Sequence, residues 1–142
     1  MSDDQMQMMK DILLSTRTVA SVGLSSSPAK ESYGIVAYLK GQGYRVIPVN
    51  PTATEILGEK AYPDLESVPE KIDVVQIFRR PEDVPPVVDS AIKVGAKVVW
   101  MQEGIVNEEA AQKARAAGLQ VVMDACMRAA HRGLIGEKPV RL

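Results

Sequence analysis

The residues best suited to bind an anion follow the apolar run 18–22. Gly23 lets a ligand approach the backbone closely, and the serines behind it can donate hydrogen bonds. Free N–H groups at the start of a following helix favour a phosphate. We therefore expect a phosphate loop formed by Gly23, Leu24, Ser25, Ser26 and Lys30. The alternative is a plain tight turn, because Gly-x-Ser is a weaker signal than Gly-x-Gly-x-x-Gly.

Two adjacent arginines, Arg79 and Arg80, follow the apolar run 73–78. Guanidinium groups grip phosphates and stack on bases, so the pair indicates a second contact with an anionic ligand. Surface ion pairs with Glu82 or Asp83 are the alternative reading. The run 97–101 is followed by Gln102 and Glu103, which could meet a polar ligand.

The end of the run 45–49 argues against a nicotinamide cofactor. NAD-binding domains usually place an acidic residue there to hold the ribose hydroxyls. This chain instead reads Pro48-Val49-Asn50-Pro51, with neither an acid for NAD nor a base for NADP.

A catalytic role for Asp124, Cys126 and His131 is disfavoured. Cys126 and His131 are five residues apart, a spacing that turns them away from each other on a helix. No residue pair is seen that would activate a nucleophile. The sequence therefore predicts no catalytic residue, and structural roles for these three.

Apolar runs alternate with helical patterns along the chain. Strands are expected at 18–22, 45–51, 73–78, 97–101 and 119–123, and helices at 32–40, 84–92 and 108–117, with a last turn or two at 124–131. This order predicts an α/β fold, a Rossmann-like three-layer sandwich with a mostly parallel five-stranded sheet. We expect one domain over 1–142, with an extra N-terminal helix at 1–16 and a tail at 133–142. Residues 52–70 are expected to hold at most a short helix and a short strand.

Composition narrows the function classes. The 142 residues are 46% hydrophobic and 25% charged, which excludes disorder as the main state. A net charge of −1 disfavours a nucleic-acid binder. One Cys and one His exclude a disulfide framework and a Cys/His metal cluster. No apolar stretch suits a membrane span and the first residues are polar, so we expect a cytoplasmic protein.

Five runs together resemble a known family: 19–25, 43–51, 73–81, 95–104 and 117–126. They are similar to the small bacterial and archaeal CoA-binding proteins, stand-alone domains like the N-terminal CoA-binding domain of the succinyl-CoA synthetase alpha subunit. The resemblance covers about residues 16–134. It departs where family members often read Glu-His and this chain reads Ala130-His131.

The resemblance implies coenzyme A or an acyl-CoA as the ligand. It places phosphates at Gly23, Leu24, Ser25 and Lys30, and the adenosine end at Pro48, Asn50 and Pro51. It places adenine and pyrophosphate beside Phe78, Arg79 and Arg80, and the pantetheine arm beside Met101, Gln102, Glu103 and Gly104. Ligase chemistry is not implied, because the larger synthetase uses a histidine in a second domain and a partner subunit.

Three functions follow in order of preference. The first is a CoA- or acyl-CoA-binding module without catalysis of its own. The second is an enzyme, either a dinucleotide-dependent oxidoreductase or a non-catalytic subunit of an acyl-CoA synthetase-type enzyme. The third is a regulatory protein that senses CoA or forms a mixed disulfide with its thiol through Cys126. A protein partner is left open.

Overall fold

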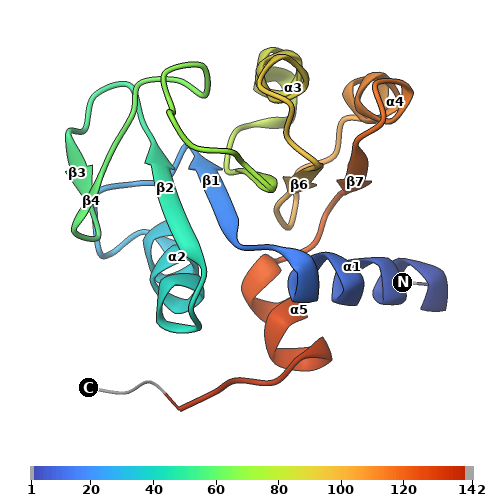
Figure 1. Ribbon diagram of the computed structural model, residues 1–142, viewed down its shortest axis with the longest axis horizontal. Helices are drawn as coiled ribbons and strands as arrows, with labels where there is room; N and C mark the ends of the chain where they lie inside the picture. The colour runs from blue at the N-terminus through green and yellow to red at the C-terminus, as the bar shows by residue number, and fades with distance from the viewer. Residues whose placement is uncertain (1, 140–142) are drawn as a thin grey trace.

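The structure is a computed structural model that describes residues 2–139 (Figure 1). Its elements follow the expected alternation of strands and helices. In chain order they are α1 (Asp3–Ser15), β1 (Thr18–Val22), α2 (Glu31–Gly41), β2 (Arg45–Val49), β3 (Glu55–Ile56), β4 (Glu59–Lys60), β5 (Val74–Ile77), α3 (Val84–Lys93), β6 (Val98–Met101), α4 (Glu108–Ala116), β7 (Gln120–Val122) and α5 (Met127–Leu134).

The main sheet has five strands in the order β2-β1-β5-β6-β7, and every neighbouring pair is parallel. The sheet is therefore entirely parallel, and the predicted Rossmann-like α/β fold is confirmed. Strand order reverses between β1 and β5. Such a reversal sends the connections after the two strands to opposite faces and leaves a crevice at their carboxyl ends.

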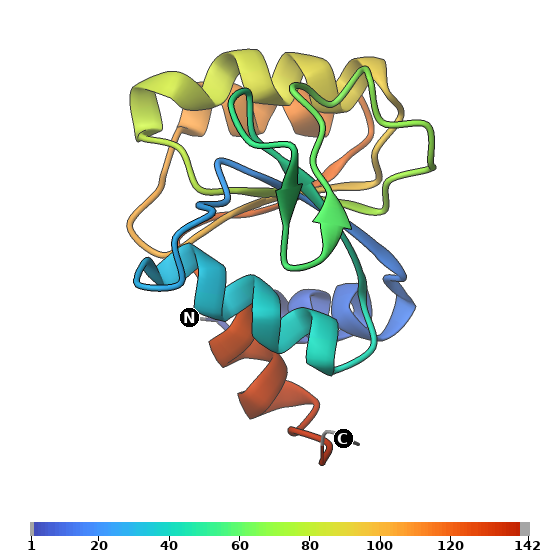
Figure 2. The ribbon, with the colours of Figure 1, turned by 90° about the vertical axis from the view of Figure 1, so that its left-hand side faces the viewer.

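Helices cover both faces of the sheet, which gives three layers. Figure 2 shows α3 and α4 above the sheet and α1, α2 and α5 below it. Successive strand residues point to opposite faces. On β1, Val19 packs with α1, α2 and α5, whereas Ala20 packs with α3 and α4. Both faces are buried, which explains why the strands read as continuous apolar runs.

A second, two-stranded sheet departs from the sequence expectation. Residues 52–70 contain the antiparallel hairpin β3–β4 in place of a short helix and strand. Leu57 and Gly58 join the strands with φ of 56° and 73°, and two successive positive φ values match a type I′ turn. The segment then returns to β2, where Tyr62 N donates to Pro48 O and Asn50 N donates to Tyr62 O.

The two ends of the chain lie close to their predicted limits. The predicted N-terminal helix is present, and Ser2 caps it, because Ser2 Oγ accepts from Gln5 N at 3.1 Å. Helix α5 extends to Leu134, so the tail begins two residues later than expected. Within the predicted helix and tail, Met1 and residues 140–142 lie outside the described residues. No helix in the described part of the chain has the length and apolarity needed to cross a membrane.

A buried histidine joins the three helices of one face. His131 of α5 is only 4% exposed, and its Nδ1 lies 2.7 Å from the hydroxyl of Tyr38 on α2. The ring of Tyr44 stands edge-on to the same imidazole, and its hydroxyl donates to Leu13 O of α1 at 2.7 Å. Burial lowers the pKa of His131, and the positive charge of Lys138 lowers it further.

The lowered pKa of His131 makes the protein less stable at mildly acidic pH. Below about pH 6.5 the unfolded chain takes up a proton at this imidazole more readily than the folded chain does. The free energy of unfolding should therefore fall as the pH drops from 7 to 5, and His131→Gln should reduce that dependence. Urea unfolding across this range tests the prediction. The chain has a single histidine, so one NMR titration reads its pKa directly, and a value at or above 6.5 contradicts it.

Gly23 allows the ends of β1 and β5 to approach each other. Its φ is +86°, in the region that favours glycine. A Cβ at this position would lie 2.8 Å from Phe78 O and 3.2 Å from Phe78 C. Both atoms belong to the backbone, so neither can move aside cheaply.

We expect Gly23→Ala to destabilise the protein more than a matched change elsewhere. Gly118 has a similar φ of +93°, but a Cβ there would meet nothing within 4 Å. Gly118→Ala therefore carries only the backbone strain, about 1–2 kcal/mol. Gly23→Ala adds the clash with Phe78 and should cost roughly 2 kcal/mol more. Chemical denaturation of both variants measures the difference, and equal losses would contradict the close approach.

Candidate functional site

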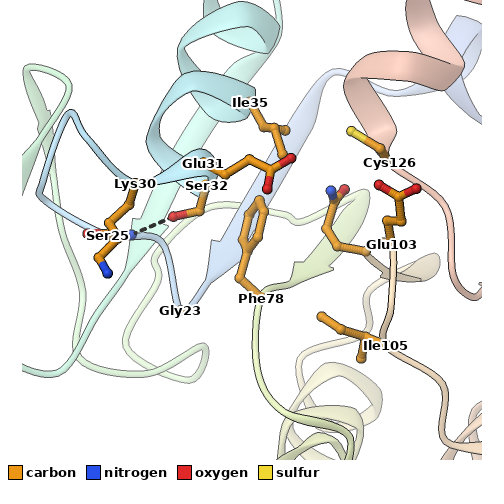
Figure 3. A pocket seen from close by; sticks show the side chains of 11 residues that line it. Gly23, Ser25, Lys30, Glu31, Ser32, Ile35, Phe78, Glu103, Ile105 and Cys126 are labelled. Carbon is orange, nitrogen blue, oxygen red and sulfur yellow. Dashed lines mark hydrogen bonds between the residues drawn. The ribbon is translucent and has the colours of Figure 1, made fainter.

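A pocket of about 380 Å³ lies at the carboxyl ends of β1 and β5 (Figure 3). This is the switch point of the sheet, where open α/β folds bind their ligands. The lining residues come from the loops after β1, β5, β6 and β7 and from the first two turns of α2. They are Gly23, Ser25, Lys30, Glu31, Ser32, Ile35, Phe78, Gln102, Glu103, Ile105 and Cys126.

One end of the pocket offers hydrogen-bond donors. Ser32 Oγ accepts from Ser25 N, and Ser25 Oγ accepts from Ser27 N, each at 3.1 Å. Because both hydroxyl oxygens accept from the backbone, their protons remain free to donate. Helix α2 begins here with Lys30 at its N-cap and no side-chain cap on its first N–H groups. Hydroxyls, helix N-terminus and ammonium group together suit an anion.

A chain of buried polar side chains runs beneath the pocket. Ser21 Oγ donates to Gln76 Oε1 at 2.8 Å, and Gln76 Nε2 donates to Gln102 Oε1 at 3.0 Å. The same Gln102 oxygen accepts from Met127 N at 3.0 Å. Met127 N is a backbone donor and cannot reverse its role, so it fixes the direction of every bond in the chain.

The fixed direction of this chain turns the Gln102 amide nitrogen into a donor for a ligand. Gln102 is 4% exposed and lines the pocket. Its oxygen is held by Gln76 and Met127, and its Nε2 has no protein partner among the described residues. A primary amide has two N–H donors, and those of Gln102 are open to the pocket. A carbonyl or phosphate oxygen of a ligand would accept from them.

Glu103 and Cys126 form the other end of the pocket. In Figure 3 they lie across Phe78 from Ser25 and Lys30. Cys126 is the N-cap residue of α5 and lines the pocket. The imidazole of His131 hydrogen-bonds with the Tyr38 hydroxyl, a contact between two helices that supports a structural role for this histidine.

The predicted site residues divide into those that line this pocket and those that do not. Gly23, Ser25, Lys30, Phe78, Gln102 and Glu103 line it together. The side chains of Leu24 and Met101 are fully buried, one in each core of the sheet. Ser26 and Gly104 are exposed outside the pocket, and Gly104 N donates to Asp124 Oδ1.

The residues predicted to line the adenosine end lie beside the pocket. Pro48 is buried within β2, and Pro51 is exposed. Asn50 is engaged by the protein, because its Nδ2 donates to Leu24 O at 3.0 Å and its Oδ1 accepts from Thr52 N and Ala53 N. Asn50 therefore ties the loop after β2 to the loop after β1.

The side chains of Arg79 and Arg80 lie in different environments. Arg79 lines a smaller cavity of about 180 Å³ together with Val49, Leu65 and Pro86, on the α3 side of the strand ends. Arg80 is 77% exposed and pairs with Asp83, Nε to Oδ2 at 3.0 Å. For Arg80 the structure thus contains the ion pair that the sequence offered as the alternative.

Four of the lining residues were not predicted as part of the site: Glu31, Ser32, Ile35 and Ile105. Three belong to the first turns of α2, and helical spacing alone signals only that Ile35 faces inward. Ser32 could have been found as a polar residue in the first turn of a helix that follows a glycine loop.

Comparison with known proteins identifies relatives over most of the chain. A family model described as "CoA binding domain" matches residues 17–132. The uncharacterized protein YneT of Bacillus subtilis (strain 168) is 42% identical over 122 residues, which are 86% of this chain and 90% of YneT. A solved structure of a hypothetical protein from Pyrococcus horikoshii OT3 is 41% identical, with a TM-score of 0.89 and 92% of each chain covered.

A longer relative shares only this region. Acetate–CoA ligase (ADP-forming) II of Archaeoglobus fulgidus is 34% identical over 83 residues, which are 57% of this chain and 12% of the ligase. These matches confirm the resemblance that the loop sequences indicated. The chain belongs to the CoA-binding domain family.

Proposed function

We propose that this protein binds coenzyme A or an acyl-CoA in the pocket at the β1/β5 switch point, in the cytoplasm and without catalysis of its own. The observation that carries the proposal is the pairing of two donor sets in one cavity. The uncapped start of α2 with Ser25 and Ser32 lies at one end, and the oriented amide of Gln102 lies toward the other.

The chemistry of coenzyme A matches this arrangement from end to end. Its pyrophosphate needs donors, which Ser25, Ser32 and the α2 N-terminus supply. Its pantetheine arm carries two amide groups, and a carbonyl of that arm would accept from Gln102 Nε2. The thiol would then reach Glu103 and Cys126. The pocket of about 380 Å³ holds only part of so long a ligand. We place the adenosine end outside it, toward Arg79 and the Asn50 loop.

The pocket favours CoA over a nicotinamide dinucleotide. Strand β2 ends in Val49, and the amide of the following Asn50 is engaged with Leu24 O. No carboxylate stands at this strand end to hold ribose hydroxyls. Absence of catalysis is supported by His131, the one histidine, which is buried against Tyr38 outside the pocket. A role as a subunit of an acyl-CoA synthetase-type enzyme is the second candidate, favoured by the match to the ligase of Archaeoglobus fulgidus.

Calorimetry with CoA and NAD tests the proposed function. We expect a saturable heat of binding for CoA and none for NAD at the same concentrations. Incubation with acyl-CoA thioesters should release no free thiol above the buffer rate. Binding of NAD in preference to CoA would overturn the proposal, and thioester turnover would overturn its non-catalytic part.

A charge-matched pair of variants tests the role of Gln102. Gln102→Glu keeps an oxygen that accepts from Gln76 and Met127, but it removes the donor and adds a negative charge. We expect CoA affinity to fall at least about tenfold. Gln112→Glu makes the same change on the exposed side of α4 and should leave affinity unchanged. Wild-type affinity in Gln102→Glu would show that the amide donates nothing to the ligand.

A further inference from the structure

A second cavity lies beside the Glu103 and Cys126 end of the pocket. It measures about 420 Å³ and lies between α1 and α5. Glu103 and Cys126 line both cavities, so the two spaces adjoin at these residues. We call the second cavity the α1–α5 cleft.

The walls of the α1–α5 cleft are apolar. Helix α1 supplies Met6 and Met9, and α5 supplies Ala129, Ala130, Gly133 and Leu134. Methionine is flexible and adapts to irregular apolar shapes, and the small residues of α5 leave room for a chain to lie along the helix. Water gains few hydrogen bonds on such walls, so an apolar occupant is favoured over solvent.

The carboxylates are confined to the mouth of the cleft. Among the described residues, its acidic lining residues are Glu103, which also lines the pocket, and Asp124, which precedes α5 by three residues. Two carboxylates at the mouth would repel a ligand whose tail carries its own carboxylate. Occupants of the cleft are therefore neutral as well as apolar.

We propose that the α1–α5 cleft receives the acyl chain of a CoA thioester, and that the preferred ligand carries a neutral, apolar acyl group of medium length. This inference rests on the proposed function, because it needs the pantetheine arm to end at Glu103 and Cys126. The sulfur is then at the point where the two cavities meet, and the acyl group enters the cleft directly.

The dimensions of the cleft set the length of the chain. A helix rises about 1.5 Å per residue, so the stretch from Cys126 to Leu134 spans about 12 Å. That distance is close to the reach of an extended eight-carbon chain. Octanoyl-CoA is therefore the appropriate probe, with CoA and succinyl-CoA as comparisons.

Calorimetry with the three ligands tests the proposal on the full chain. We expect octanoyl-CoA to bind at least about tenfold more tightly than CoA, because each buried methylene adds to binding. Burial of the chain should also make the heat capacity change of binding more negative. Succinyl-CoA should bind no more tightly than CoA. Equal affinity for CoA and octanoyl-CoA overturns the acyl cleft and leaves CoA binding intact, whereas failure of all three ligands to bind refutes the proposed function.

A variant that fills the cleft separates it from the pocket. A Cβ at Gly133 would meet nothing within 4 Å, so Gly133→Leu fits the fold and also favours the helix. It should abolish the preference for octanoyl-CoA and leave CoA affinity unchanged. Ala116→Leu adds a leucine to an exposed position of α4 and should retain the preference. If Gly133→Leu retains the preference for octanoyl-CoA, the cleft is not an acyl site. The same conclusion follows if sedimentation shows that the wild-type protein is a dimer and that Gly133→Leu dissociates it, because the cleft is then covered by a second copy of the chain.

Discussion

The hydrogen bond from Met127 N to Gln102 Oε1 determines the polar interior of this protein. A backbone N–H can only donate, so Gln102 must present its oxygen to α5. Gln76 must then present its nitrogen to Gln102, and Ser21 must donate to Gln76. The single bond thus orders side chains from β1, β5 and the loop after β6 at once. It also caps a helix whose N-cap residue, Cys126, supplies no side-chain bond. The geometry of the pocket follows from this chain.

Much of the fold could be predicted because the strands are covered on both faces. Runs such as 46–49 and 98–101 are apolar throughout, and a proline or a glycine follows each of them within three residues. The hairpin β3–β4 escaped prediction for two physical reasons. Its strands have two residues each and carry the charged Glu55, Glu59 and Lys60. Its type I′ turn uses Leu57 at a positive φ, where Asn or Gly would have given a recognisable signal.

The sequence predicted the location of the candidate site more reliably than it predicted which side chains point into it. Strand ends in a parallel sheet converge, so Gly23, Phe78 and Gln102 were expected together. The direction of each side chain depends on packing that the sequence does not display. Leu24 and Met101 stand beside pocket residues in sequence, yet their side chains are in the two cores. Cys126 reaches the pocket because α5 starts only after it, and a shift of one residue in the helix start would have pointed it elsewhere.

Helix α1 lies outside the residues that the family model matches, which begin at position 17. It nevertheless supplies Met6 and Met9, one whole wall of the cleft beside α5. In the proposed binding mode, the loops that would face the nucleotide and the helix that would face the opposite end of the ligand are therefore separate segments of the chain. Substitutions in a single peripheral helix can retune which tail is accepted while the head-group loops stay untouched. Divergence among such proteins would then be concentrated in their first fifteen residues.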